Sequence, residues 1–346
     1  MFVQTKKKMR VKELNNKLAR IACSPYNVYP AYIAAATASE QSDLTIGINS
    51  TIDLLHLDLS NSNTDLEIVK SINIESRCSK LIWSENKTNS SLNAKNFLIS
   101  GCEDTKIYIY DTDNNSINLI ETLEKHQSGA IQTIDLNPFQ TNLLASGAGA
   151  SEIFIWDLNN PLVPMTPGSK QQPLDDVNCV AWNRQVQHIL ASTCSGKCVV
   201  WDLRKNESII KISENMSKLK AKLVAWHPDI ATQICLSSDD DHTPYLQLWD
   251  LRFATSPVRV LEGHHQGILN FSWSQMDSNL LISSAKDNRI ICWNPNNVTT
   301  NGEILYDLPT SGQWCFDLAW SQRNPDLICT SSYEGIIHLS LLNYYN

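Results

Sequence analysis

Short apolar runs recur along the whole chain, and each ends in an aromatic residue followed by an acid or an amide. The clearest runs occupy residues 107–111, 153–157, 198–202, 246–250 and 290–294. Degenerate versions end at Asp58 and Ser340. The final residues of the runs lie 44 to 53 positions apart, which indicates seven units of about 47 residues.

Three further series of short strands run in phase with the first. One ends in Trp in most units, with Cys23 and Leu136 standing in for Trp in two of them. A second is rich in small residues, as at 97–101 and 143–147, and a third follows each aromatic–acid pair, as at 209–212. Four short strands per unit, separated by Asn, Pro, Gly and Asp turns, predict an all-β chain and exclude a helical repeat.

A period near 45 residues with Trp-Asp endings is typical of a WD-repeat β-propeller, so the fold class predicted is a seven-bladed propeller. The units use nearly all of the chain, which predicts a single domain over 1–346. The last unit has no fourth strand of its own, and residues 10–14 form an unassigned strand-like segment. We expect that segment to complete the last blade and close the ring, the alternative being a frayed tail. Loop insertions at 86–96 and 239–244 account for the longest units.

One unit carries the full polar set of a WD repeat: His264, Ser283, Asp287 and Trp293. An indole N–H, a hydroxyl, an imidazole and a carboxylate can hydrogen-bond in series, so we interpret the set as a structural tetrad. His, Ser and Asp also form hydrolytic triads, but these three lie at the fixed offsets of one blade. Another unit keeps His126, Ser146 and Trp156, with Ala150 where the acid would stand.

Charge and composition narrow the function further. The chain has 28 Lys and Arg against 36 Asp and Glu, a net charge of −8, which argues against a nucleic-acid partner. No apolar segment has the length or flanks of a signal peptide or a membrane span. The ten cysteines are spread through strand-like runs and lack zinc-finger spacing, which indicates a reduced protein. No phosphate-binding loop or catalytic set is evident, so we expect no enzyme activity, no metal and no cofactor.

Two charged segments allow more than one interpretation. The loop Asp239-Asp240-Asp241-His242 is either a solvated loop or an acidic loop that binds a metal or a partner. The N-terminal Lys6-Lys7-Lys8, with Arg10 and Lys12, is either solvated or in contact with anionic lipid.

Arg204 and Arg252 each follow a Trp-Asp pair by two positions. Consecutive boxes of this kind resemble those of substrate receptors of cullin-type ubiquitin ligases, where the Arg meets the ligase adaptor. The simpler interpretation is that each Arg pairs with an acid on its own rim.

Longer stretches resemble one particular family. They are residues 139–143, 151–160, 164–168, 181–190, 200–207, 226–229, 248–254 and 313–317. Together they are similar to the N-terminal propeller of the larger outer-coat subunit of the COPII vesicle coat, with departures at Cys23 and in the loop at 86–96.

The resemblance implies a non-enzymatic scaffold that contributes to the cage around vesicles travelling from the endoplasmic reticulum to the Golgi. It implies a cytoplasmic location, peripheral on COPII vesicles and endoplasmic reticulum exit sites. The implied partners are other coat copies at cage vertices, a smaller WD-repeat outer-coat partner and inner-coat subunits, the last two mainly through regions beyond this chain. The alternative function is a substrate receptor of a ubiquitin ligase.

Overall fold

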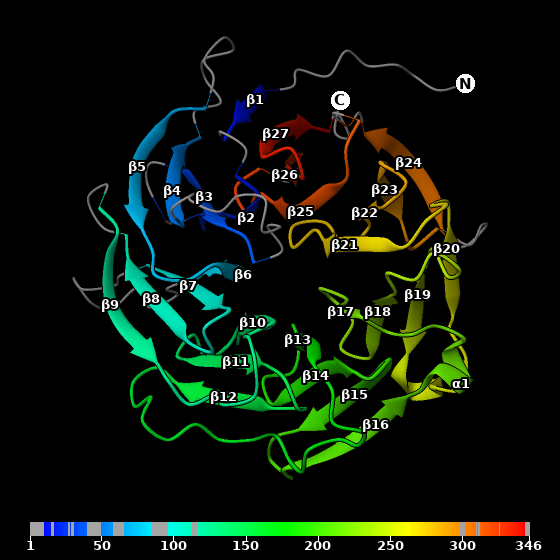
Figure 1. The fold of residues 1–346 in the computed structure, drawn as a ribbon. Coiled ribbons are helices and arrows are strands. Elements are labelled where there is room, and N and C mark those ends of the chain that lie inside the picture. Colours follow the sequence, from blue (N-terminus) through cyan, green and yellow to red (C-terminus); the bar gives the residue numbers. More distant parts are fainter. Residues whose placement is uncertain are drawn as a thin grey trace.

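Seven β-sheets stand around a central axis in the computed structural model of this protein (Figure 1). The structure describes residues 10–14, 17–26, 28, 31–39, 50–57, 66–84, 96–112, 116–297, 302–308, 310, 312–324 and 326–342. We number the sheets as blades 1 to 7 in chain order. The first strand of each blade contacts the first strand of the next, so these strands line the axis.

The strands of blades 1 to 4 follow the sequence in order. Their bounds are β2 (Ala19–Cys23), β3 (Tyr32–Thr37), β4 (Thr51–His56) and β5 (Ile68–Asn73); β6 (Cys78–Trp83), β7 (Phe97–Cys102), β8 (Ile107–Asp111) and β9 (Asn118–Leu123); β10 (Thr133–Leu136), β11 (Leu143–Gly147) and β12 (Ile153–Asp157); and β13 (Val177–Trp182), β14 (Ile189–Cys194), β15 (Lys197–Asp202) and β16 (Glu207–Ile212).

The remaining blades also form antiparallel sheets. Their strands are β17 (Leu223–Trp226), β18 (Gln233–Ser237), β19 (Tyr245–Asp250) and β20 (Arg259–Glu262); β21 (Ile268–Trp273), β22 (Leu281–Ala285), β23 (Ile290–Asn294) and β24 (Glu303–Leu308); and β25 (Cys315–Trp320), β26 (Leu327–Ser332) and β27 (Ile336–Leu341), with β1 (Arg10–Glu13). The helices of the described residues are one turn of α-helix, α1 (Glu214–Ser217), and one 3₁₀ turn, η3 (Leu251–Phe253). Neither is long enough to cross a membrane.

The apolar runs of the sequence become the middle strands of the blades, which are buried on both faces. Trp156, Trp201, Trp249 and Trp293 are among the largest fully buried side chains. The hydrophobic clusters join neighbouring blades: Trp249 packs in one cluster with residues of β14 and β15, and Trp293 in another with residues of β18 and β19. Burial of apolar surface between blades is therefore what holds the ring together.

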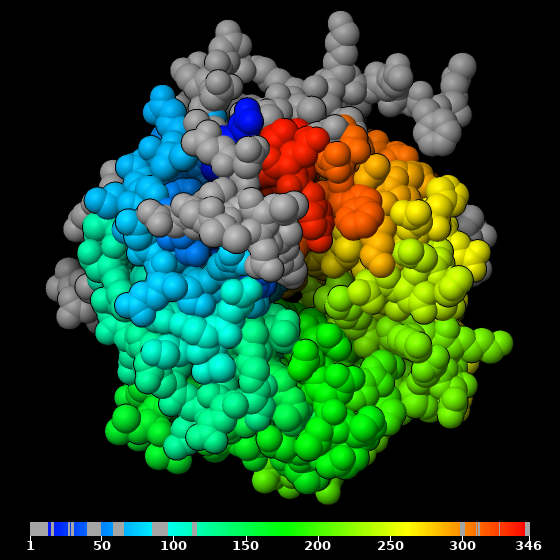
Figure 2. Space-filling model, in the orientation of Figure 1, coloured from blue at the N-terminus to red at the C-terminus, as the bar shows by residue number. Residues whose placement is uncertain are grey.

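The ring closes through the chain's own N-terminal strand, as predicted. β1 pairs antiparallel with β27, with Arg10 opposite Leu339 and Glu13 opposite Ile336. β1 is thus the fourth strand of blade 7, and Figure 2 shows the blue N-terminal atoms beside the red C-terminal ones. This pairing covers an edge of β27 that would otherwise be open.

Blade 3 differs from the prediction of four strands per unit. Within the described residues its sheet has three strands, and a single bridge between Ile155 and Met165 stands where a fourth would pair. The segment that follows β12 carries Pro161, Pro164 and Pro167. Proline has no N–H to donate to a ladder, so the repeated prolines prevent a regular strand there.

Three features named from the sequence lie outside the described residues: Asp58, the Lys6-Lys7-Lys8 segment and most of the insertion at 86–96.

Candidate functional site

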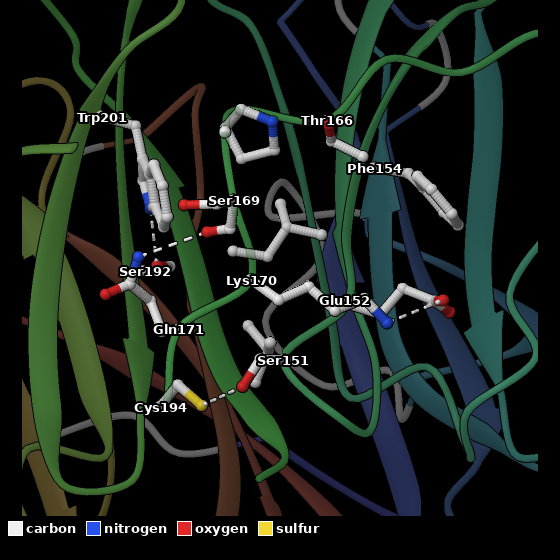
Figure 3. A pocket seen from close by; sticks show the side chains of 14 residues that line it. Ser151, Glu152, Phe154, Thr166, Ser169, Lys170, Gln171, Ser192, Cys194 and Trp201 are labelled. Carbon is white, nitrogen blue, oxygen red and sulfur yellow. Dashed lines mark hydrogen bonds and ion pairs between the residues drawn. The ribbon is translucent and has the colours of Figure 1, made fainter. Parts of the chain in front are cut away.

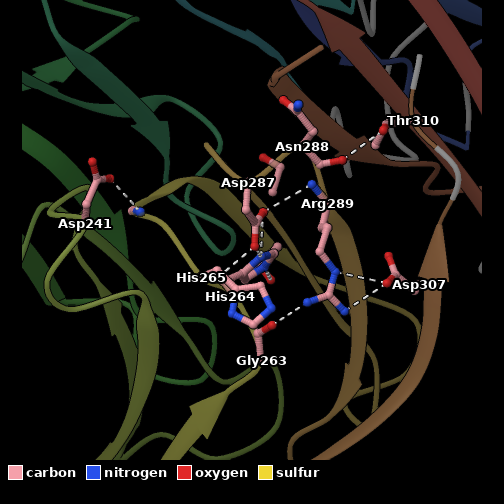
Figure 4. A network of polar contacts seen from close by, with 12 residues as sticks. Asp241, Gly263, His264, His265, Asp287, Asn288, Arg289, Asp307 and Thr310 are labelled. Atoms are coloured by element: carbon pink, nitrogen blue, oxygen red, sulfur yellow. Dashed lines mark hydrogen bonds and ion pairs between the residues drawn. The ribbon is translucent and has the colours of Figure 1, made fainter. Parts of the chain in front are cut away.

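The four residues of the predicted tetrad meet in blade 6 and form one hydrogen-bond chain. Figure 4 shows the part of it formed by His264 and Asp287. Trp293 Nε1 donates to Ser283 Oγ at 2.8 Å, and Ser283 Oγ lies 2.7 Å from His264 Nε2. His264 Nδ1 lies 3.2 Å from both carboxylate oxygens of Asp287. The four residues come from different strands and loops. The hydrogen-bond chain therefore links β23, the third strand of blade 6, to the loop before β21 and the loop after β22.

Asp287 also accepts hydrogen bonds from the backbone of two loops, the one before β21 and its own between β22 and β23. Its carboxylate accepts the N–H of His265 at 2.9 Å and that of Arg289 at 3.1 Å. Burial favours the protonated acid, but the hydrogen bonds from His264 and His265 outweigh burial and hold the pKa of Asp287 below its usual value. An ionised Asp287 accepts from His264 Nδ1–H, which leaves Nε2 to accept from the Ser283 hydroxyl.

The tetrad has no free nucleophile. The Ser283 hydroxyl is bonded by both Trp293 and His264, and the residue is 0% exposed. A hydrolytic triad needs a serine that a substrate reaches, so this geometry supports the structural interpretation over the hydrolytic one.

Blade 3 contains a second chain of four, of which three members were expected from the sequence and the acid, Glu152, was not. Trp156 Nε1 donates to Ser146 Oγ at 2.8 Å, His126 Nε2 lies 2.7 Å from that oxygen, and His126 Nδ1 lies 2.9 Å from Glu152 Oε2. The sequence places Ala150 where the acid was sought, and the longer Glu152 side chain fills the role from two positions on.

The electrostatics of this second chain resemble those of the tetrad. Burial lowers the pKa of His126, so the ring is neutral. For Glu152, burial favours the neutral acid, but hydrogen bonds from His126 and from the N–H of Gln127 lower its pKa.

A further set of contacts joins neighbouring blades through tryptophans whose role the sequence does not indicate. Four indoles on innermost strands donate to a carbonyl of the preceding blade's innermost strand. These bonds run from Trp83 to Ala22, from Trp182 to Asp135, from Trp226 to Ala181 and from Trp320 to Ser272, at 2.9 to 3.1 Å. Trp273 departs from the rule and donates to Ser278 in its own blade.

The residue after some of these strands adds a second tether. Asn183 Oδ1 accepts two backbone N–H groups of its own turn, from Gln185 and Val186. Its Nδ2 donates to the Ala231 carbonyl of the next blade at 2.8 Å. Asn137 makes the equivalent bond to Gln187. In the sequence, the signal for this tether is the asparagine directly after Leu136 and Trp182, the last residues of β10 and β13.

The acidic loop at Asp239–Asp241 is clasped between blades 5 and 6. Lys222 Nζ lies 2.6 Å from Asp239 Oδ2, and Lys286 Nζ donates to the Asp239 carbonyl at 2.6 Å. Asp241 accepts the N–H of Gly267 at 2.9 Å, which lowers its pKa. A Cβ on Gly267 would stand 2.0 Å from the Asp239 carbonyl oxygen, so only glycine permits this approach.

Arg204 and Arg252 each pair with the aspartate of their own box. Arg204 Nη2 lies 3.1 Å from Asp202 Oδ2, and Arg252 Nε lies 3.0 Å from Asp250 Oδ1. The hydrogen bonds from Arg252 lower the pKa of Asp250 to about 2. Both Arg side chains remain more than 60% exposed. This geometry favours the rim-pairing interpretation of both residues.

Metal-ligating residues do not gather among the described residues, where no group of three or more His, Cys, Asp and Glu could hold an ion. The ten cysteines are free thiols, and burial raises the pKa of Cys235, for example.

Comparison with known proteins agrees with this geometry. The family model described as "WD domain, G-beta repeat" matches residues 168–202 and 255–294. The protein transport protein Sec31A of Rattus norvegicus is 46% identical over 336 residues, which cover 96% of this chain and 26% of the relative. Human Sec31A is 47% identical over 334 residues, covering 95% of this chain and 27% of the relative, and the SEC31 of Dictyostelium discoideum is 35% identical over 374 residues, covering 97% and 27%.

Solved structures give the same result. A chain in the structure titled "COPII on membranes, outer coat vertex" superposes with a TM-score of 0.82 at 30% identity, covering 95% of this chain and 85% of that one. A chain in "The structure of the COPII coat assembled on membranes" matches with the same score and identity, with 47% of that chain covered. The present chain spans about a quarter of the length of the relatives named above. It belongs, on its sequence and its fold together, to the N-terminal WD-repeat propellers of Sec31-type coat subunits.

Proposed function

We propose that this chain is the propeller of a COPII outer-coat subunit and that it contributes, without catalysis, to assembly of the coat cage. The observation that carries the proposal is the match to a chain of the outer coat vertex over 95% of this chain, at 30% identity and a TM-score of 0.82. The fold suits the role, because a closed ring of small sheets presents many loops and rims on a rigid frame.

The finer parts of this function are proposed with it. Residues 1–346 act as a single propeller domain. The domain meets other coat copies at cage vertices, while the smaller WD-repeat partner and the inner-coat subunits are held mainly by regions beyond it. It is cytoplasmic, and it is peripheral on vesicles and on endoplasmic reticulum exit sites through the coat. Each vertex contact is small, and the repetition of contacts in the lattice supplies the strength.

A chimera tests the proposal. The propeller of human Sec31A is replaced by this chain, and the hybrid is assembled with the other purified coat proteins on giant vesicles. Electron tomography is expected to show closed cages with propeller density at the vertices. A human protein lacking its propeller is the control and is expected to assemble poorly. If the chimera binds the vesicles but assembles no better than that control, the proposal is wrong.

The ubiquitin-ligase alternative is not carried forward. The two Arg residues that suggested it bond the carboxylates of their own boxes, and no other contact among the described residues favours it.

A further inference from the structure

A cavity of about 80 Å³ lies between blades 3 and 4, beneath the proline-rich segment that replaces the fourth strand of blade 3 (Figure 3). Ile153, Phe154, Val177 and Trp201 supply its apolar walls. An apolar cavity of about 150 Å³ takes up benzene, so this smaller space suits an aliphatic side chain better than an aromatic ring.

Among the described residues, the edge of β12 beside this cavity has backbone N–H and C=O groups without a backbone partner. Ile155 exchanges two backbone bonds with Met165, at 2.7 and 2.9 Å. Residues two apart on a strand point their backbone groups to the same side, so Ile153 directs its N–H and C=O toward the segment at 166–171. No backbone bond joins Ile153 to that segment among the residues described.

Two lysines, Lys197 and Lys220, lie near the cavity although the chain as a whole is acidic. From Lys197 to Lys222 the sequence has seven basic side chains against three acidic ones. Lys197 Nζ donates to the Gln172 carbonyl at 3.5 Å, one residue from the cavity wall. Lys220 packs beside Gly196, where an added Cβ would lie 3.5 Å from its Cα and side chain.

These lysines are available to a ligand. Lys220 is exposed, and Lys197 is half-buried. Within the described part of the chain, neither lysine has a carboxylate within 4.0 Å. Lys170 on the cavity wall differs, since it lies 3.5 Å from Glu152.

Acidic residues limit the width of the basic surface. Asp175 and Asp176 are exposed in the connection that leads to blade 4, and Asp239–Asp241 follow β18 in blade 5. An anionic bilayer or a nucleic-acid duplex presents negative charge over a broad area and would meet these carboxylates as well. A narrow anionic chain would contact the lysines alone.

We propose that the seam of blades 3 and 4 binds a short acidic peptide segment of a partner protein, with one aliphatic side chain in the cavity and its flanking carboxylates against Lys197 and Lys220. Ile153, which among the described residues makes no backbone bond to the segment at 166–171, lines the cavity that the aliphatic side chain enters. This goes beyond the coat function, because cage contacts do not require a peptide in this cavity.

Fluorescence anisotropy with defined peptides tests the proposal. The probe is fluorescein-labelled EDELDED, and the comparison peptides are EDESDED, which lacks the aliphatic anchor, and KRKLKRK, which reverses the charge. The 346-residue chain is expected to bind EDELDED about tenfold more tightly than EDESDED, the change expected for burying one leucine side chain. KRKLKRK is expected to show no binding.

Matched variants assign the binding to this seam. K197E/K220E is expected to weaken binding about tenfold and to reduce its dependence on salt. K70E/K125E makes the same charge change on blade 1 and between blades 2 and 3, and it is expected to change the affinity less than about twofold. Ser169→Trp places a bulky ring on an exposed position of the cavity wall and is expected to abolish the preference for leucine. Circular dichroism and melting temperature verify that each variant is folded.

Three results would overturn the proposal. One is no saturable binding of EDELDED up to about 1 mM. Another is equal binding of EDELDED and EDESDED, or equal loss in K70E/K125E and K197E/K220E. The third is recruitment of the chain by phosphatidylserine vesicles through Lys197 and Lys220, which would make the surface a lipid contact. None of these results bears on cage assembly by the chimera.

Discussion

At the residue scale, two buried chains of polar groups show how a carboxylate fixes the orientation of a histidine inside a blade. Asp287 and Glu152 differ in length and in sequence offset, yet each accepts from an imidazole Nδ1 and from a backbone N–H. The histidine requires an ionised carboxylate oxygen beside its Nδ1, and the backbone conformation of each turn brings the acid to that position. In blade 3 the turn does so with Ala150 and Ser151 at φ of 50° and 56°.

Asp287→Ala is the first substitution to test. It leaves His264 and two backbone N–H groups without their acceptor, and we expect a loss of about 1–3 kcal/mol in the free energy of unfolding. Lys70→Ala, on an exposed outer strand, is the control and is expected to cost less than about 0.5 kcal/mol. Urea unfolding followed by tryptophan fluorescence measures both. Equal costs would show that the tetrad does not stabilise the fold.

The His126–Glu152 pair predicts a loss of stability in acid. Burial lowers the pKa of His126 in the folded state, so the unfolded chain takes up that proton first as the pH falls below 6.5. The lowered pKa of Glu152 acts in the same direction at lower pH, since its contribution is present above the unfolded pKa and is lost as pH falls through the folded one. Both effects remove stability on acidification.

His126→Gln removes the first of these titrations. We expect a lower stability at pH 7.5 but a smaller further loss between pH 7 and pH 5.5 than in the unsubstituted chain. Chemical unfolding across that range provides the comparison, with His265→Gln as the exposed control. An identical pH slope in His126→Gln and the unsubstituted chain would contradict the assignment.

At the element scale, the ring depends on contacts between strands that are remote in sequence. β1 closes blade 7, and indole N–H groups of β6, β13, β17 and β25 reach back to the preceding blade. Each contact supplies a hydrogen-bond partner to a carbonyl or a strand edge. Without it, water would have to enter between the blades to hydrogen-bond that group.

Deletion of residues 1–14 tests the closure. The truncated chain exposes the edge of β27, so we expect a lower melting temperature and faster aggregation than in a chain lacking only residues 1–9. Differential scanning fluorimetry and light scattering are the measurements. Equal melting of the two truncations would mean that β1 does not hold the ring closed.

Asn183→Ser isolates a single tether between blades. Serine is the residue at the corresponding position of blade 6, where Ser274 Oγ accepts the turn N–H groups of Met276 and Asp277. The substitution therefore keeps the turn but removes the Nδ2 bond to Ala231, and we expect a cost of about 0.5–1.5 kcal/mol. Urea unfolding measures the cost. Asn178→Ser is the control, because the side-chain amide of Asn178 makes an exposed hydrogen bond, to the Asp176 carbonyl. A cost no larger than the control's would show that the tether adds nothing.

At the scale of the whole molecule, seven similar blades make a rigid frame with varied loops, and the charge is unevenly spread over it. The net charge is −8, yet the stretch from Lys197 to Lys222 is basic. Acidic residues on both sides of that stretch favour narrow anionic ligands over broad ones.

Nucleic acid is therefore expected to bind poorly. A gel-shift assay with duplex DNA or RNA at about 150 mM salt should show no specific complex, because the surface offers too few contiguous cations to release counterions. A salt-sensitive shift at micromolar protein would contradict this expectation.

The repeat in the sequence determined the fold class, the number of blades, the closing strand and the members of the blade 6 tetrad. It could do so because each blade buries the same pattern of residues, so the pattern recurs at a fixed spacing. The tertiary structure decided three features that this spacing does not encode. Glu152 takes the place of an aspartate from a shifted position, and blade 3 has three strands in its described sheet. Lys222 and Lys286 form ion pairs with Asp239 and Asp241. The lost strand follows from Pro161, Pro164 and Pro167, which break the pattern of the repeat locally. The position of Glu152 and the contacts of Lys222 and Lys286 depend on the approach of side chains from neighbouring blades or turns, and that distance is set only when the ring closes.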